Sequence, residues 1–158
     1  MRFLGGEIVP PEHAEAVVRK WLHRWDVNDL GPFVIERRED GRFLGRAGIN
    51  VWDTRTWTHT TLEKGGASSQ AELGWALVRA QWGNGYATEA ARAVRNWARE
   101  ERGICRLVSL IARDNTASQR VAQRLGARPT ETVTLFDSAD AVVWEYPPGR
   151  TALTTAPP

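Results

Sequence analysis

The stretch from residue 71 to residue 90, AELGWALVRAQWGNGYATEA, constrains the fold more than any other part of the chain. Its first half, residues 72–78, is a short apolar run that is typical of a buried strand. Its second half begins an amphipathic helix, in which apolar residues recur at spacings of three and four. Gly83 and Gly85 lie between the two halves, so this stretch predicts a strand, a tight turn and a helix in direct succession.

The rest of the chain predicts one α/β (α+β) domain over residues 1–146 and a disordered, Pro- and Thr-rich tail over residues 147–158. A first helix follows Pro10, because an apolar stripe runs from Ala14 to Trp25. Residues 53–70 are polar and predict a long loop, anchored only by Trp57 and Leu62. Strands are expected at residues 33–37, 43–52, 107–111, 132–136 and 142–146, and a further helix from about Thr116 to Leu125.

Charge and composition exclude several classes of function. The 158 residues include 21 basic and 19 acidic side chains, a balance that gives no basic surface for nucleic acid. No apolar run approaches the ~18 residues that cross a membrane, and the N-terminus lacks a secretion-signal pattern. We therefore expect a cytoplasmic protein. The three histidines show no metal-ligand spacing, so no metal is expected.

The glycine-rich turn is suited to an anion. The start of a helix offers unpaired backbone N–H groups and the positive end of the helix dipole, and glycines let a phosphate approach the backbone. Two common phosphate motifs do not match, because the Gly-Lys-Ser/Thr of a Walker loop is absent and Thr88 stands where a dinucleotide fingerprint needs Gly or Ala. A turn that only reverses the chain remains the structural alternative.

This stretch, together with RDNTASQRVAQRLGA at residues 113–127, resembles the GNAT superfamily of acetyl-CoA-dependent N-acetyltransferases, in particular its ribosomal-protein N-terminal acetyltransferase branch. The resemblance covers roughly residues 1–146. It implies that backbone amides of the turn bind the pyrophosphate of acetyl-CoA. The residues that occupy the family's loop are Trp82, Gly83, Asn84, Gly85, Tyr86 and Ala87, with Trp82 in place of the family's Gln or Arg.

The same resemblance implies a mixed, mostly antiparallel sheet, flanked by helices, that splays open between its fourth and fifth strands to admit the pantetheine arm. Ala76, Leu77 and Val78 match the strand end that lines this opening. Asn115 and Ser118 match an Asn-x-x-Ser pair near the thioester sulfur. A simple helix cap explains that pair equally well, and both roles are compatible.

Acetyl transfer from a thioester to an amine needs a base, an oxyanion donor and a proton for the thiolate. Glu72, among apolar neighbours at the start of its strand, matches the position of the family's base candidate and would take the proton through water. A solvent-facing strand residue is the alternative. The N–H near Leu77 would polarise the thioester oxygen and Ser118 would serve the thiolate. Neither Tyr86 nor Tyr146 lies in the helix after Asn115, where many relatives have a tyrosine acid.

Tryptophan positions give a further expectation. Trp52 and Trp57 flank the polar loop and are expected near the acceptor. The tryptophans that fall on apolar stripes are expected in the core; they are Trp21, Trp25, Trp75 and Trp97.

Residues 1–6 resemble a segment that family members reach only after a first strand and a first helix. Either the start of the sequence is assigned too late, or the domain lacks both elements. Their loss would leave an exposed edge strand, which a second copy of the chain could cover as a homodimer. Three functions follow: an N-acetyltransferase for a protein N-terminus or a small amine, a domain that binds acyl-CoA without chemistry, and an unrelated nucleotide-binding domain.

Overall fold

The computed structural model describes residues 10–135 and 139–149. Within them, no helix is both long enough and apolar enough to span a bilayer. The elements in chain order are α1 (Pro11–Asn28), β1 (Pro32–Glu36), β2 (Phe43–Asp53), β3 (Thr58–His59), α2 (Leu62–Gly65), η1 (Gly66–Ser68), β4 (Ser69–Leu77), η2 (Arg79–Gln81), α3 (Tyr86–Glu100), β5 (Leu107–Ile111), α4 (Thr116–Arg124), β6 (Arg128–Leu135) and β7 (Ala139–Glu145).

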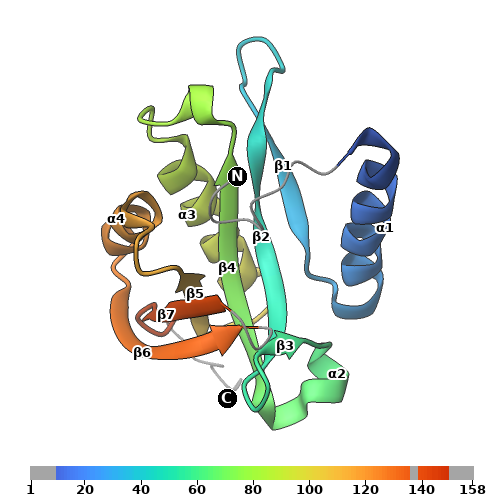
Figure 1. Ribbon diagram of the computed structural model, residues 1–158, viewed down its shortest axis with the longest axis vertical. Helices are drawn as coiled ribbons and strands as arrows, with labels where there is room; N and C mark the ends of the chain where they lie inside the picture. The colour runs from blue at the N-terminus through green and yellow to red at the C-terminus, as the bar shows by residue number, and fades with distance from the viewer. Residues whose placement is uncertain (1–9, 136–138, 150–158) are drawn as a thin grey trace, which may run out of the picture.

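The strands form one sheet in the order β1-β2-β4-β5-β7-β6, with β3 paired to β2. Every pair is antiparallel except β4 and β5, which are parallel and share only the positions Ala71↔Leu107 and Glu72↔Val108. After Glu72 the two strands separate, and β5, β7 and β6 run across the direction of β2 and β4 (Figure 1). The predicted splayed, mostly antiparallel sheet is therefore confirmed.

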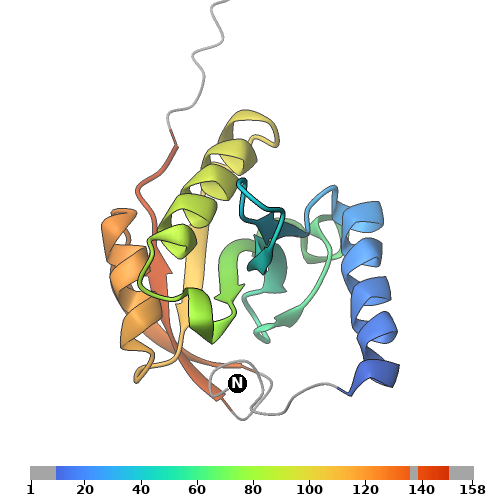
Figure 2. The ribbon, with the colours of Figure 1, turned by 90° about the horizontal axis from the view of Figure 1, so that it is seen from above.

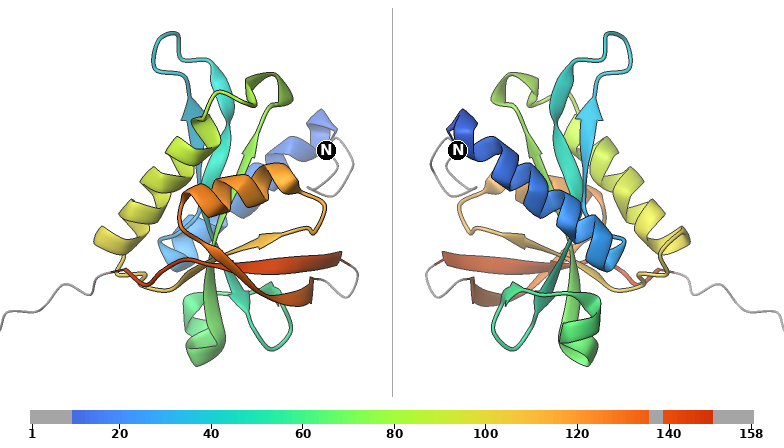
Figure 3. Two further views of the ribbon diagram at one scale, coloured as in Figure 1. Left: turned by 90° about the vertical axis from the view of Figure 1, so that its left-hand side faces the viewer. Right: turned by 90° about the vertical axis from the view of Figure 1, so that its right-hand side faces the viewer.

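The two faces of the sheet carry different layers. Helices α3 and α4 lie together on one side of the molecule, and α1 lies on the other side of the β1–β2 hairpin (Figures 2 and 3). Leu73, Ile49 and Leu107 point toward α3 and α4 and join the main core. Val108 and Val143 belong to a second cluster on the opposite face. Because side chains alternate along a strand, Glu72 points away from the face of Leu73.

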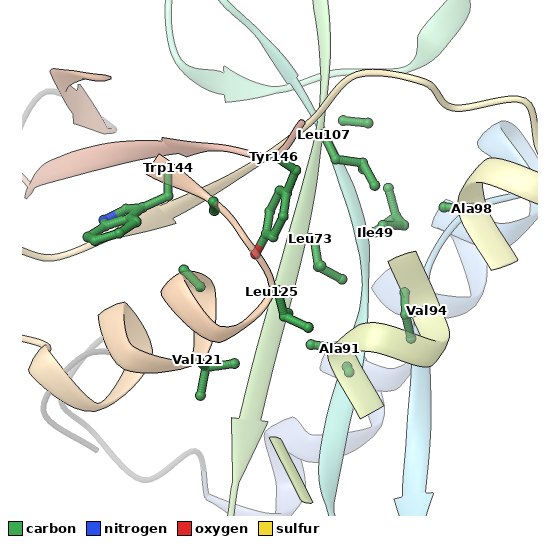
Figure 4. Close-up of a cluster of buried hydrophobic side chains, with 14 of the residues drawn as sticks. Ile49, Leu73, Ala91, Val94, Ala98, Leu107, Val121, Leu125, Trp144 and Tyr146 are labelled. Carbon is green, nitrogen blue, oxygen red and sulfur yellow. The ribbon is translucent and has the colours of Figure 1, made fainter. Parts of the chain in front are cut away.

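A side-chain hydrogen bond stands at the point where the sheet opens. The buried Ser109 hydroxyl donates to the backbone oxygen of Leu73 at 2.5 Å and lies 2.9 Å from the Tyr146 hydroxyl. Figure 4 shows the Tyr146 ring beside Leu73 and Leu107. Burial raises the pKa of Tyr146 to about 12, so its hydroxyl keeps its proton at neutral pH. If the β4–β5 ladder continued past Glu72, a backbone N–H of β5 would donate to the Leu73 carbonyl. The Ser109 hydroxyl donates to that carbonyl instead.

The polar segment at residues 53–70 is not one long loop, as the sequence predicted. It contains β3, α2 and η1, each too short to leave a periodic pattern. Trp57 packs against the second cluster, as expected of an anchor, whereas Leu62 is 37% exposed and does not act as one. Strand β6 also begins earlier than predicted, at Arg128.

Two expectations about apolar residues were wrong. On α1 the stripe is only partly covered, since Val18 and Leu22 are 46% and 58% exposed. The most buried tryptophans are Trp52 and Trp144, each 4% exposed. The four that were expected in the core are only half-buried: Trp75 and Trp97 pack against the edge of the main core, Trp25 contacts Phe33 and Trp97, and Trp21 lies under Arg46.

The predicted tail begins with residues that contact the domain. The Arg99 guanidinium donates to the Pro147 carbonyl, and the Gly149 N–H donates to the Cys105 carbonyl at 3.1 Å. The remainder of that tail lies outside the described residues. So does the segment 1–6 on which the expected loss of a first strand and helix rested.

Ser109→Ala should destabilise the protein, because it leaves the buried Leu73 carbonyl and the Tyr146 hydroxyl without their shared partner. The expected loss in the free energy of unfolding is about 1–3 kcal/mol, measured by urea denaturation. Ser118→Ala is the matched control, since the Ser118 hydroxyl makes no hydrogen bond to a described residue. A loss for Ser109→Ala no larger than the control's would contradict this role.

Candidate active site

The turn before α3 is built on two glycines with left-handed backbone conformations. Gly83 and Gly85 both have φ of 84°, a region that other residues enter only with strain. A Cβ added at either position would meet no atom within 4 Å. The glycines are therefore needed for the path of the backbone, and the space beside them stays open to a ligand.

This path leaves a row of backbone donors without partners. None of the N–H groups of residues 83–88 donates to another residue that the structure describes, and the N-cap residue Gly85 has no side chain to cap the helix. Two side-chain hydrogen bonds hold the turn in place. The Trp82 indole donates to the Leu77 carbonyl at 2.9 Å, and the Asn84 amide donates to the Gln81 carbonyl at 3.3 Å. Backbone N–H groups that are held in a fixed position at the start of a helix are suited to bind a phosphate.

The opening between β4 and β5 presents the backbone of alternate residues. Because the Leu73 carbonyl points to β5, strand alternation directs the backbone groups of Trp75 and Leu77 the same way. The Leu77 carbonyl is taken by the Trp82 indole. The Trp75 N–H and C=O and the Leu77 N–H therefore face the opening, while the Val78 N–H is bonded to the Leu44 carbonyl across the sheet.

Glu72 stands where the opening begins, and it is 8% exposed, which excludes a solvent-facing role. Its Oε2 accepts hydrogen bonds from Asn50 Nδ2 and from Trp52 Nε1, each at 2.8 Å. Its Oε1 accepts none from the described residues. A Cβ added to Gly74 would lie 3.5 Å from Oε1, so glycine there leaves the space beside this oxygen open. One oxygen fixes the carboxylate and the other is available to a reactant.

Arg24 of α1 fixes the orientation of the Asn50 amide that binds Glu72. Its guanidinium donates to Asn50 Oδ1, which turns the amide so that Nδ2 faces Glu72. The same guanidinium lies 3.3 Å from His59 Nε2, which must accept because arginine has no acceptor. The sequence reasoning missed Arg24 and Asn50; the one local signal is that β2 carries polar residues, Arg46 and Asn50, among apolar ones.

Two guanidinium groups surround the carboxylate with positive charge. Burial lowers the pKa of Arg24 and of Arg46, and the attraction of Glu72 opposes that shift in both. Arg46 also lies over the Trp21 ring, 5.0 Å from its centroid. Trp52 donates to Glu72, and its ring centroid lies 4.2 Å from that of His59 with the two planes tilted by 36°. This face therefore presents a fixed carboxylate in a cationic setting.

The predicted Asn115–Ser118 pair forms a helix cap, in which Asn115 Oδ1 accepts from the Ser118 N–H at 3.1 Å. Helix α4, which contains Ser118, packs on the face of the sheet that carries Leu73, whereas Glu72 points to the opposite face. Glu89 is exposed in the first turn of α3. No group of three metal-ligating side chains occurs among the described residues.

Comparison with known proteins identifies the class that this fold and site define. Residues 1–128 match the family model of the acetyltransferase (GNAT) domain, and the chain belongs to that family. It is 31% identical over 128 residues to the uncharacterized protein YkkB of Bacillus subtilis, which covers 78% of this chain and 68% of YkkB. A crystal structure of an acetyltransferase from Agrobacterium tumefaciens is 31% identical with a TM-score of 0.70, covering 92% of this chain and 76% of that one.

More distant solved structures share the fold alone. A ribosomal-protein-alanine N-acetyltransferase from Brucella melitensis is 19% identical, with a TM-score of 0.64 over 82% of this chain and 76% of that one. AAC(6')-Ib, solved with ribostamycin and coenzyme A, is 18% identical with a TM-score of 0.69, over 92% of this chain and 79% of that one. The ribosomal-protein acetyltransferases are thus among the structural neighbours, as the sequence predicted.

The contact of His59 with Arg24 predicts a pH dependence of stability. Burial and the Arg24 charge lower the pKa of His59 from 6.5 to about 4. The unfolded chain therefore takes up this proton first as the pH falls, so the free energy of unfolding should decrease between pH 6.5 and pH 4. This contribution is fully present above pH 6.5.

His59→Gln should flatten that part of the profile, measured by denaturation at a series of pH values, and the exposed His13→Gln should not. The Asp40 and Asp53 carboxyls, which arginine partners hold at a pKa of about 2, lower stability mainly near and below their ordinary value of 3.8, so they contribute only at the acid end of this range. An unchanged slope in His59→Gln would rule out the neutral, Arg24-bonded histidine.

Proposed function

We propose that the protein is an acetyl-CoA-dependent N-acetyltransferase that moves acetyl to a primary amine by direct attack in a ternary complex. The observation that carries this proposal is the Glu72 carboxylate, with one oxygen fixed by Asn50 and Trp52 and the other open beside Gly74. It stands at the point where β4 and β5 separate. A carboxylate buried this way at the mouth of an opening is placed to accept a proton.

The binding roles follow from the unpaired backbone groups. The N–H row at residues 83–88 would hold the pyrophosphate, and the Trp75 backbone would pair with the pantetheine arm as a further strand would. The Leu77 N–H, which faces the opening, would donate to the thioester oxygen, where negative charge develops during attack. AAC(6')-Ib, a neighbour of the same fold, was solved with coenzyme A, which supports coenzyme A as a ligand for a domain of this fold.

The chemical step requires two proton transfers. The amine nitrogen forms a bond to the acetyl carbon while the C–S bond breaks, and Glu72 Oε1, directly or through water, takes the proton that the nitrogen loses. The Ser118 hydroxyl, on the other face of the opening, would protonate the departing thiolate and be reprotonated from water. No metal and no covalent enzyme intermediate are needed. The acceptor would be a protein N-terminus or a small amine.

Glu72→Gln should lower the turnover number by about 10²–10⁴-fold, because the amide keeps the shape of the side chain but cannot take the proton. Thiol release from acetyl-CoA in the presence of an amine measures turnover, and calorimetry measures acetyl-CoA affinity, which should change little. Glu89→Gln is the matched control, since Glu89 is a carboxylate on the surface of α3.

Equal turnover in Glu72→Gln and wild type would remove Glu72 as the base. Tight binding of acetyl-CoA without thiol release across a broad panel of amines would favour the second function, a domain that binds acyl-CoA without chemistry. A preference for ATP over acetyl-CoA would instead support an unrelated nucleotide-binding domain.

A further inference from the structure

A pocket of about 370 Å³ lies beside the site, between α1, the outer edge of β2, and the β3–α2 segment. Its thirteen lining residues include Lys20, His23, Arg24, His59 and Lys64, and none of them is an aspartate or a glutamate. Asn50 lines the pocket as well, and the same side chain binds Glu72. The pocket is therefore cationic and reaches the carboxylate through one shared residue.

The two lysines of this pocket have no salt-bridge partner within the described part of the protein. None of the salt bridges there includes Lys20, Arg24 or Lys64. The carboxylates nearest to them in sequence, Glu15, Asp26 and Glu63, are not among the residues that line the pocket. Arg24 is bonded to two neutral groups, the Asn50 amide and the His59 ring. Glu72 attracts Arg24 from outside the pocket, whereas Lys20 and Lys64 stand around a cavity whose lining holds no carboxylate.

The position of the pocket limits the ligand. Glu72 on β4 and Asn50 on β2 are direct cross-strand partners, so about 4.8 Å separates the two strands at this point. The pocket lies along the far edge of β2, about one more strand spacing away. A molecule with its nitrogen at Glu72 would therefore place a group in the pocket about 5–10 Å from that nitrogen.

We infer that the acceptor is an amine that carries an anionic group, a carboxylate or a phosphate, several bonds from the nitrogen that is acetylated. Lys20, Lys64 and Arg24 would bind the anion, and Glu72 would take the proton from the amine. This inference rests on the proposed function, whose acceptor it narrows. Polyamines and aminoglycosides carry several positive charges, and the same cations would repel them.

The test compares three amines of equal chain length: ε-aminocaproate, n-hexylamine and hexamethylenediamine. Thiol release from acetyl-CoA is measured with each, and each is titrated calorimetrically into the protein with and without coenzyme A. The wild type should prefer the carboxylate in both measurements. Lys20→Gln combined with Lys64→Gln should reduce that preference by about two- to thirtyfold, the range expected for losing two exposed charge pairs.

Arg92→Gln combined with Arg128→Gln is the control for net charge, because both arginines are exposed on α3 and β6, away from the pocket lining. It should retain the preference. Equal binding and equal acetylation of the three amines, or a preference that survives loss of both lysines, would overturn the pocket assignment while leaving acetyl transfer intact. Failure to bind acetyl-CoA would instead overturn the proposed function, and the titrations without coenzyme A would still decide the pocket.

Discussion

The hydrogen bond from Ser109 to the Leu73 carbonyl fixes where the sheet opens, and the proposed site depends on that position. The parallel ladder between β4 and β5 ends at Glu72↔Val108, one residue before Leu73. A ladder that continued would pair the Trp75 and Leu77 backbone groups with β5 and fill the opening. Because Ser109 and Tyr146 occupy the junction instead, the strand beyond it keeps free donors and acceptors, and Glu72 is the last paired residue before them.

The two sides of this opening differ in their charged groups. On one side, the helix dipole of α3 and six N–H groups without partners among the described residues form the proposed phosphate site, which is neutral but polarised. On the other face, Arg24 and Arg46 surround one buried carboxylate whose geometry Asn50 and Trp52 fix. The proposed base and the proposed phosphate site therefore lie on opposite faces of the sheet, so under the proposed function two substrates can approach one opening without competing for the same cations.

Structural features that depend only on neighbouring residues in the sequence were predicted well. The strand, the turn at Gly83 and Gly85, and the helix after it each leave a local pattern, and the Asn115 cap is set by a spacing of three residues. The hydrogen-bond partners of Glu72 could not be predicted from a local sequence pattern. Asn50 reaches it through the β2–β4 register and Arg24 through helix packing, so both depend on tertiary structure. The short elements at residues 53–70 were missed because each spans too few residues to show a period.

Amide hydrogen exchange, resolved by residue and compared with and without acetyl-CoA, tests the central claim most directly. The account predicts new protection at the N–H groups of Trp75 and Leu77 and along residues 83–88, because these are the donors that the fold leaves unpaired. Strand β6, on the far edge of the sheet, should not change. Binding of acetyl-CoA that protects other segments and leaves Trp75, Leu77 and the turn unchanged would contradict the account.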